Sequence, residues 1–556
     1  MDLSIRIGGE AGQGLVSAGD LLAGAFAAAG LQVFSGKGYM SRIRGGLNWY
    51  DIRISDEELF ALSEKPDLLV ALIPTALDIL RNETSSQSVL IQNSADTAVD
   101  GVMNVNFSEL AKQNGGSEIM ANAVAAGTVF GLLRYSLDGL CTYLKKEFKD
   151  KGGDVIKQNQ ACARAGYELA SKTGKKLQAP KPGTPSGKVT AGADALGLGA
   201  AVAGVKMAIA YPMSPATATF TFLAQHADKY RIVVEQAEDE IAAVNMICGG
   251  AYAGVPAMTM TSGGGFALMC EGLSLAGMME LPILIMIAQR PGPATGMPTR
   301  TAQEDLKFAV NAGHGEFPRA VFAPGTIEQC YHLTRHALET AHRFQSPAII
   351  LTDQYLQDVK KNIPELAEKY QPIDRNIGSW KTINYQRYAD SEDGISPREI
   401  PGGKALVLSD SDEHFESGHL TEDFATRIML QDKRMRKLEL LEREFVMPEI
   451  YGKKNSELYV ICWGSAFGPC RELVDRMNSG KVSATLVHFS QVWPLPGKKL
   501  KKLLDKPKRV IVVENNFIGQ FRALLREVGI SRPLEGINRY DGLPLTCDYL
   551  WKELKK

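Results

Sequence analysis

Four acidic residues crowd the end of a predicted strand and the start of the helix that follows it: Glu235, Glu238, Asp239 and Glu240. Acidic side chains in the first turn of a helix are stabilised by the helix dipole, and this structural role is the simplest interpretation. A chemical role needs one of these carboxylates to be buried beside a cofactor nitrogen, where its charge can assist a proton transfer. The residue pattern leaves both interpretations open.

Two proline-rich loops follow other predicted strands and carry polar groups. Residues 211–220 read YPMSPATATF, so two prolines flank Ser214 and restrict the backbone that holds its hydroxyl. Residues 289–300 read QRPGPATGMPTR, in which Arg290 and Arg300 form a cationic loop suited to bind a carboxylate. The respective alternatives are a stiff connection without a ligand and a surface loop with solvated arginines.

A glycine-rich turn near the N-terminus is a weaker signal. GGEAGQG (8–14) joins a predicted strand to a helix, whose N-terminus can receive an anion. The turn matches neither the GxGxxG fingerprint nor a Walker loop, which ends in Lys-Ser or Lys-Thr. On the pattern alone, a tight turn that needs glycine for steric reasons is favoured.

The composition argues against several classes of protein. The 62 basic and 63 acidic residues among 556 nearly cancel, so neither nucleic acid nor a membrane is expected as a partner. The eight cysteines contain no CxxC pair and the histidines lack metal-site spacing, so no zinc or iron–sulfur ligand set is visible. No apolar stretch reaches membrane-spanning length, and no signal peptide is recognisable. We therefore expect a cytoplasmic protein without its own metal site.

The elements that position these residues form three α/β blocks. In the second block, apolar strands of the kind that parallel sheets bury alternate with helical patterns, which predicts a doubly wound, mostly parallel sheet. The acidic cluster and both proline-rich loops follow its strands, at the carboxyl edge where open α/β sheets bind ligands. The predicted parts are a domain over 1–176, a linker over 177–188, the doubly wound domain over 189–375, a polar connecting segment over 376–450 and a smaller α/β domain over 451–556.

Motifs over nearly the whole chain resemble those of the 2-oxoacid:ferredoxin oxidoreductases, with their γ and α parts fused in that order. In the first block these are GGEAGQGL (8–15), GYMSRIRGG (38–46) and DIRIS (51–55). In the second they are YPMSPAT (211–217), QAEDEIAAVNMICGGAYAG (236–254), TSGGGFALM (261–269) and RPGPATGMPTRTAQEDL (290–306). Further along they are EHFESGHLTED (413–423), DKRMRKL (432–438), CWGSAFGP (462–469), PLPG (494–497) and ENNFIGQF (514–521). Each motif is weak alone, and their number and order carry the resemblance.

The resemblance implies an enzyme that oxidatively decarboxylates a 2-oxo acid on thiamine diphosphate, joins the acyl group to coenzyme A and passes electrons to ferredoxin. The second block then corresponds to the domain that binds the pyrimidine ring, and the last block to a transketolase C-terminal-like domain. In the family a GDG…N motif on the β subunit holds the diphosphate and its Mg²⁺, and neither this motif nor the cluster cysteines occurs here. The resemblance thus implies a β subunit that carries Mg²⁺, a 4Fe–4S cluster and the rest of the site, with dimerisation of αβ pairs.

The resemblance also assigns roles to residues. Glu240 matches the carboxylate beside the pyrimidine N1′, which favours the imino tautomer whose amine takes the C2 proton. Ser214 matches a hydroxyl near the substrate carboxylate, although Thr is common there, and Arg290 matches an arginine that binds this carboxylate or the developing charge. Ala294 departs from the RxGPSTG pattern, which has Ser at this position. The cofactor-binding residues are then Tyr211, Pro212, Glu240, Ser262 and Gly263.

The fused arrangement and the length most resemble the 2-oxoglutarate-oxidising members of the family. Their substrate has a distal carboxylate, for which Arg300 or the β subunit would supply a cation. For coenzyme A, the resemblance suggests Gly12, Gln13 and Gly14 of the first glycine-rich turn. Two alternatives remain open: pyruvate or a branched-chain 2-oxo acid as the substrate, and a non-catalytic subunit of such a complex.

Overall fold

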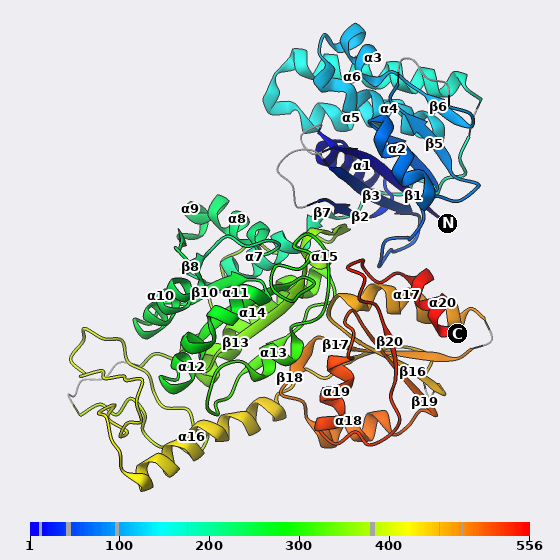
Figure 1. Ribbon diagram of the computed structural model, residues 1–556. Coiled ribbons are helices and arrows are strands. Elements are labelled where there is room, and N and C mark those ends of the chain that lie inside the picture. The colour runs from blue at the N-terminus through cyan, green and yellow to red at the C-terminus, as the bar shows by residue number, and fades with distance from the viewer. Residues whose placement is uncertain are drawn as a thin grey trace. The chain divides into compact units, whose positions relative to one another are not determined.

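The computed structural model of the chain describes residues 1–10, 14–40, 46–94, 99–174, 176–378, 384–454, 456–480 and 482–556. The chain divides into two compact units, and Figure 1 labels many of their helices and strands. The first unit comprises Met1–Ala191, Asp358–Glu365 and Thr546–Tyr549, and the second comprises Gly192–Gln357, Leu366–Leu545 and Leu550–Lys556. The predicted α/β class is confirmed, because each unit combines sheets with helices.

The first unit is built on a mixed eight-stranded sheet of order β6-β5-β4-β1-β3-β2-β14-β7. β1 pairs parallel with β4 on one side and antiparallel with β3 on the other, so the strand pairing changes from parallel to antiparallel at β1. Its strands are β1 (Asp2–Glu10), β2 (Gln32–Gly38), β3 (Leu47–Ser55), β4 (Leu68–Ala71), β5 (Val89–Gln92), β6 (Val102–Asn104), β7 (Lys188–Ala191) and β14 (Lys360–Ile363). Its helices are α1 (Leu15–Ala28), α2 (Pro74–Leu80), α3 (Phe107–Gly115), α4 (Ala121–Leu133), α5 (Leu137–Glu147) and α6 (Gly153–Lys172).

The second unit contains a seven-stranded sheet of order β18-β12-β13-β11-β10-β8-β9. All of its pairs are parallel except that of β12 with β18, as predicted for a doubly wound domain. Its strands are β8 (Met207–Ala210), β9 (Val233–Gln236), β10 (Ala257–Thr261), β11 (Ile283–Gln289), β12 (Ala320–Phe322), β13 (Ala348–Asp353) and β18 (Gln491–Trp493). The helices in this part are α7 (Gly192–Ala203), α8 (Thr217–Gln225), α9 (Ala227–Tyr230), α10 (Glu240–Tyr252), α11 (Gly263–Leu268), α12 (Cys270–Met278), α13 (Leu306–Asn311), α14 (Ile327–Phe344) and α15 (Gln354–Asp358).

The same unit holds a five-stranded sheet of order β15-β17-β16-β19-β20, in which only β15 is antiparallel to its neighbour. Its strands are β15 (Glu449–Gly452), β16 (Leu458–Trp463), β17 (Ala484–Phe489), β19 (Arg509–Glu514) and β20 (Glu535–Asn538). The remaining helices are α16 (Phe424–Arg443), α17 (Phe467–Asn478), α18 (Gly497–Leu504), α19 (Gln520–Glu527) and α20 (Cys547–Leu554).

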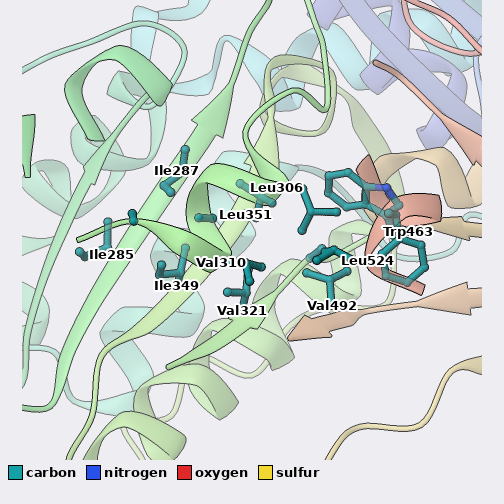
Figure 2. Close-up of a cluster of buried hydrophobic side chains, with 14 of the residues drawn as sticks. Ile285, Ile287, Leu306, Val310, Val321, Ile349, Leu351, Trp463, Val492 and Leu524 are labelled. Carbon is teal, nitrogen blue, oxygen red and sulfur yellow. The ribbon is translucent and has the colours of Figure 1, made fainter. Parts of the chain in front are cut away.

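One apolar core connects the two sheets of the second unit, and Figure 2 shows part of it. β11 and β13 are buried along their whole length, which explains their continuous apolar sequence. Side chains of these strands pack in the same core as side chains of α13 and of the segment after residue 456, which includes the five-stranded sheet. The labelled members are Ile285, Ile287, Leu306, Val310, Val321, Ile349, Leu351, Trp463, Val492 and Leu524. Because Leu306 and Val310 are buried here, the position of α13 is fixed by the core.

Two helices differ from what the local sequence pattern indicates. The pattern over 265–280 is that of one continuous helix, but the structure has two helices, α11 and α12, and the glycines of TSGGG form the first turn of α11. The charged helical sequence over 431–445 belongs to α16, which starts earlier, at Phe424, because the Asp423 side chain accepts a hydrogen bond from the Thr426 N–H (2.8 Å) and caps it.

Buried charges hold α16 against the second unit. The Glu280 carboxylate accepts hydrogen bonds from Lys433 Nζ (2.8 and 3.0 Å) and from Lys437 Nζ, and all three side chains are buried. The two ammonium groups keep the pKa of Glu280 well below its usual range, although burial acts in the opposite direction. Burial lowers the pKa of Lys437 to about 7. The connecting segment is thus attached by ion pairs as well as by apolar contacts.

Features that would indicate a membrane or a metal are sparse in the described ranges. No single helix there is long and apolar enough to cross a membrane; the bent pair Phe107–Gly115 and Glu118–Leu133 passes on length and composition only. No group of three or more His, Cys, Asp or Glu side chains in the same ranges could hold a metal ion. The eight cysteines, all within these ranges, form no disulfide.

Candidate functional site

Four neighbouring parallel strands of the second unit end at one edge of the sheet. β11, β10, β8 and β9 are adjacent, so the segments that follow them lie next to one another. Ser214 follows β8, Glu240 follows β9, Ser262 follows β10 and Arg290 follows β11. The edge therefore brings together residues that the sequence predicted from four separate motifs.

The acidic cluster divides into a helix cap and one buried carboxylate. The Asp239 side chain accepts a hydrogen bond from the Ala242 N–H (2.7 Å) and caps α10, while Glu235 and Glu238 are exposed. Glu240 is only 2% exposed, and the Thr261 hydroxyl donates to its Oε1 (3.2 Å). The structural interpretation holds for Asp239, and the buried carboxylate that a chemical role requires is that of Glu240.

Glycines at the start of α11 allow two carboxyl groups to approach it. A Cβ atom at Gly265 would lie 2.2 Å from Glu240 Oε1 and 2.1 Å from Thr261 Oγ1. A Cβ atom at Gly263 would lie 2.4 Å from Oδ1 and 2.5 Å from Oδ2 of Asp305. No side chain fits at either position without displacing these groups, which explains why glycines occupy this turn.

Arg290 links the loops after β8 and β11 across the end of β10. Its Nη1 donates a hydrogen bond to the main-chain oxygen of Ser214 (2.7 Å), and Ser214 itself is exposed. Burial lowers the pKa of the half-buried Arg290 guanidinium, whereas the negative charges of Asp305 and Glu240 act to raise it. Because an arginine stays protonated, this group is a cation with a fixed direction, able to bind a carboxylate.

Asp305 is a component of the site that the sequence did not identify. Its main-chain N–H donates to Gln289 Oε1 (3.0 Å), which ties the start of α13 to the end of β11. Its Oδ2 is buried without a hydrogen-bond partner among the described residues. Burial and the neighbouring Glu304 raise the pKa of Asp305 to about 7, and Arg290 opposes them. The available signal was an acid directly before an apolar helix, in the loop that starts at Arg290.

The remaining residues predicted to bind the cofactor or the substrate lie at the end of β8, at the start of α11 and at the far end of the loop after β11. Tyr211 is exposed and Pro212 is half-buried at the end of β8, and Ser262 is fully buried at the start of α11. Arg300 is at the opposite end of its loop from Arg290. Its Cβ atom lies next to Gly542, at 3.2 Å from the position that a Cβ atom on this glycine would occupy.

The residues suggested for coenzyme A fall only partly within the structure. Gly12 and Gln13 lie outside the described residues. Gly14 has a φ of 75°, which favours glycine, and its main-chain oxygen accepts a hydrogen bond from Asn122 Nδ2 (3.1 Å). In the first unit it lines a pocket of about 470 Å³ at the start of α1, together with Lys37 and Trp49.

Comparisons with known proteins identify the family. Residues 198–433 match the family described as "Pyruvate flavodoxin/ferredoxin oxidoreductase, thiamine diP-bdg", residues 4–169 match "Pyruvate ferredoxin/flavodoxin oxidoreductase", and residues 456–542 match "Pyruvate:ferredoxin oxidoreductase core domain II". The 2-oxoacid:ferredoxin oxidoreductase subunit alpha of a Sulfolobus species is 32% identical over 630 aligned positions, which cover 100% of this chain and 97% of the relative. The chain belongs to the 2-oxoacid:ferredoxin oxidoreductase family.

Other members of the family agree with this assignment. The 2-oxoglutarate oxidoreductase subunit KorA of Mycobacterium tuberculosis is 26% identical, with 94% of this chain and 86% of KorA covered. A solved structure of 2-oxoglutarate:ferredoxin oxidoreductase from Magnetococcus marinus, with 2-oxoglutarate, coenzyme A and succinyl-CoA bound, is 32% identical. It superposes with a TM-score of 0.93, covering 100% of this chain and 99% of that chain. The resemblance inferred from the motifs is thereby confirmed, and the chain is an oxidoreductase of this family.

Proposed function

We propose that the chain is the α subunit of an enzyme that oxidatively decarboxylates 2-oxoglutarate to succinyl-CoA and reduces ferredoxin, in a reaction that is reversible in principle. The observation that carries the proposal is the pairing of a buried carboxylate, Glu240, with a fixed cation, Arg290, at one sheet edge. The Magnetococcus marinus relative supports the substrate, because its structure holds 2-oxoglutarate, coenzyme A and succinyl-CoA.

The residues at this edge fit the pyrimidine half of thiamine diphosphate. When bound, thiamine diphosphate would supply a nucleophilic carbon for addition to the 2-oxo carbon and a cationic ring that can hold the electron pair left by decarboxylation. The contribution of this chain is a carboxylate that holds a proton at a ring nitrogen, and Glu240 is buried with Thr261 as its hydroxyl partner. Gly263 and Gly265 leave the start of α11 without side chains, and Tyr211, Pro212 and Ser262 complete the proposed contacts.

The substrate side of the site is proposed for Arg290, Ser214 and Arg300. Arg290 is anchored through one nitrogen to Ser214 O, so its other N–H groups are directed away from that anchor and can donate to the 2-oxo carboxylate. The exposed Ser214 hydroxyl would contact the same carboxylate. Arg300 would bind the distal carboxylate that 2-oxoglutarate has and pyruvate lacks.

A β subunit is proposed to complete the site with Mg²⁺, the diphosphate pocket and a 4Fe–4S cluster, in a dimer of αβ pairs that reduces ferredoxin. The relatives named subunit alpha support a partner chain. Exposed apolar side chains close to the half-site also support it: Tyr211, Ile241, Leu268 and Met297. The lack of disulfides among the described cysteines fits the reducing cytoplasm, which we propose as the location.

Coenzyme A is proposed to bind the first unit through the turn that contains Gly12, Gln13 and Gly14. The pocket beside Gly14 supports this assignment, because the first turn of α1 lines it and Lys37 adds a cation. We also keep the division into domains over 1–176, 189–375 and 451–556, with 177–188 and 376–450 as the connections, as part of the proposal.

The test is reduction of a viologen dye by the chain purified with its native partner, with coenzyme A present and 2-oxoglutarate or pyruvate offered separately. Fast reduction with 2-oxoglutarate alone, dependent on coenzyme A, would support both reaction and substrate. A preference for pyruvate or a branched-chain 2-oxo acid would keep the reaction and replace the substrate. No reduction with any 2-oxo acid, by a complex that contains thiamine diphosphate and iron, would favour a non-catalytic subunit instead.

A further inference from the structure

The Arg290 guanidinium is influenced by the negative charges of two carboxyl groups, Asp305 and Glu240, that differ in their surroundings. Glu240 receives a hydrogen bond from Thr261, whereas Asp305 Oδ2 is buried without a partner among the described residues. A buried carboxylate oxygen without a donor is costly when ionised and cheaper when the group is neutral. Burial of Oδ2 without a donor therefore favours the neutral form of Asp305.

The Asp305 carboxyl cannot move far from Arg290 to avoid a new charge. Its main chain is tied to Gln289, and the next residue, Leu306, is fully buried in the core drawn in Figure 2. On its other side the carboxyl packs against Gly263 with no space for even a Cβ atom between them. A negative ligand charge placed beside Arg290 can therefore be compensated by protonation of Asp305 rather than by movement of its carboxyl group.

We propose that Asp305 is a positioning residue that takes up a proton from solvent when the carboxylate of a 2-oxo acid binds at Arg290, and releases it when the site empties. This inference rests on the proposed function. With Asp305 neutral, one fewer protein carboxylate opposes the charge of Arg290, and more of that charge is available to the substrate. With Asp305 ionised, the empty site keeps Arg290 partly compensated in its half-buried position.

The charges around Asp305 agree with this assignment. Glu304 precedes it in the chain, and its negative charge favours the neutral form of Asp305, while Arg290 favours the ionised form. Glu240 acts on the same Arg290 from α10. Lys307, on the following helix, is paired with Glu527 (2.5 Å). A bound substrate carboxylate adds a negative charge beside Arg290 and shifts the balance further toward the neutral form.

The sign of the pH dependence follows. The pKa of Asp305 is raised from 3.8 to about 7, so above pH 7 the Asp305 carboxyl of the empty site is mostly ionised. Binding of the 2-oxo acid is then accompanied by uptake of a proton at Asp305. Affinity for the 2-oxo acid is then expected to fall by up to about tenfold per pH unit above pH 7, and to level off below it. At about pH 8 the uptake should approach one proton per site.

The experiment is isothermal titration calorimetry of the complex with its native partner and thiamine diphosphate. The ligand is an acyl phosphonate monoester, which has the charge of a 2-oxo acid but cannot lose CO₂. Titrations at pH 8 in two buffers with different ionisation enthalpies count the protons taken up. We expect uptake in the wild type and none in Asp305→Asn, whose affinity should be independent of pH between 6 and 8.5. Asp305→Ser, which places a small neutral side chain at the N-cap position of α13, should behave in the same way.

Glu304→Gln is the matched control, because it removes a carboxylate of the same loop. It should retain proton uptake, with the midpoint of the pH dependence moved to lower pH. Unchanged uptake in both Asp305 variants, or no uptake in the wild type, would overturn the inference. If the analogue fails to bind an active complex, the pH dependence of KM for the substrate decides in its place, with a flat profile expected for Asp305→Asn. A complex that turns over no 2-oxo acid contradicts the proposed function itself, which is a different result.

Discussion

Replacement of Glu240 by Gln separates a chemical role from a structural one. The amide has the shape of the carboxylate and its oxygen can still accept the hydrogen bond from Thr261, so the packing of the site is retained. What is lost is the negative charge at a position that is only 2% exposed. The measurement is dye reduction by the complex with its partner, together with the affinity for thiamine diphosphate and the thermal unfolding midpoint.

The two roles predict effects of very different size. If Glu240 only stabilised the first turn of α10, the change would cost about 0.3–1 kcal/mol of stability and leave turnover intact. If it holds a proton at the cofactor, turnover should fall by about 10²- to 10⁴-fold, equivalent to about 3–5 kcal/mol in the activation free energy. We expect the second result, with folding and cofactor binding largely retained.

Glu238→Gln is the matched control, since it makes the same charge change at an exposed position two residues earlier. It should leave turnover within about twofold of the wild type, as expected for a surface substitution within about 0.5 kcal/mol. The reasoning is refuted if Glu240→Gln, with thiamine diphosphate fully bound, keeps more than a tenth of the wild-type rate. It is equally refuted if both variants lose activity to the same extent.

Three other substitutions test neighbouring parts of the structure. Gly265→Ala would put a Cβ atom 2.2 Å from Glu240 Oε1, so dye reduction should fall on the order of 10²-fold while circular dichroism stays unchanged; normal activity would contradict the close approach. Arg300→Gln should raise KM for 2-oxoglutarate by about 10- to 100-fold and leave KM for pyruvate unchanged; equal effects on both substrates would exclude a contact with the distal carboxylate. Glu280→Gln leaves two buried ammonium groups uncompensated and should cost about 3–5 kcal/mol, whereas Lys437→Met removes the surplus positive charge and should cost less in thermal unfolding; the reverse order would contradict the ion-pair account.

The location of the site could be predicted from the sequence because it depends on strand order and chain direction. Continuous apolar strands indicated a parallel sheet, and the loops at its carboxyl edge contain the proline-locked serine and the arginine. The acidic cluster could not be resolved in the same way. Successive residues of a helix point about 100° apart, so Asp239 can cap the helix while Glu240 turns inward, and composition cannot distinguish the two. The structure assigns one role to each.

Contacts between loops could not be predicted from the sequence, for a different reason. Asp305 meets Gly263, and Thr261 donates to Glu240, although these partners are far apart in the chain. A glycine whose Cβ atom would collide with a distant carboxylate looks, in the sequence, like any glycine of a tight turn. Such a position is determined by how α13 packs in the core, and it requires the three-dimensional arrangement of several elements at once.

The two carboxyl groups whose charges act on Arg290 can be distinguished by what each variant leaves intact. Glu240 has a hydroxyl partner and a buried, fixed position, so its substitution should remove turnover but leave the proton uptake on substrate binding unchanged. Asp305 has an oxygen without a partner among the described residues, so its substitution should remove the proton uptake and leave measurable turnover. If instead each variant abolished both properties, Glu240, Asp305 and Arg290 would have to be treated as one strongly coupled group, since interacting sites titrate jointly. Separate roles are therefore assigned only if the Glu240 variant loses turnover and keeps proton uptake while the Asp305 variant loses proton uptake and keeps turnover.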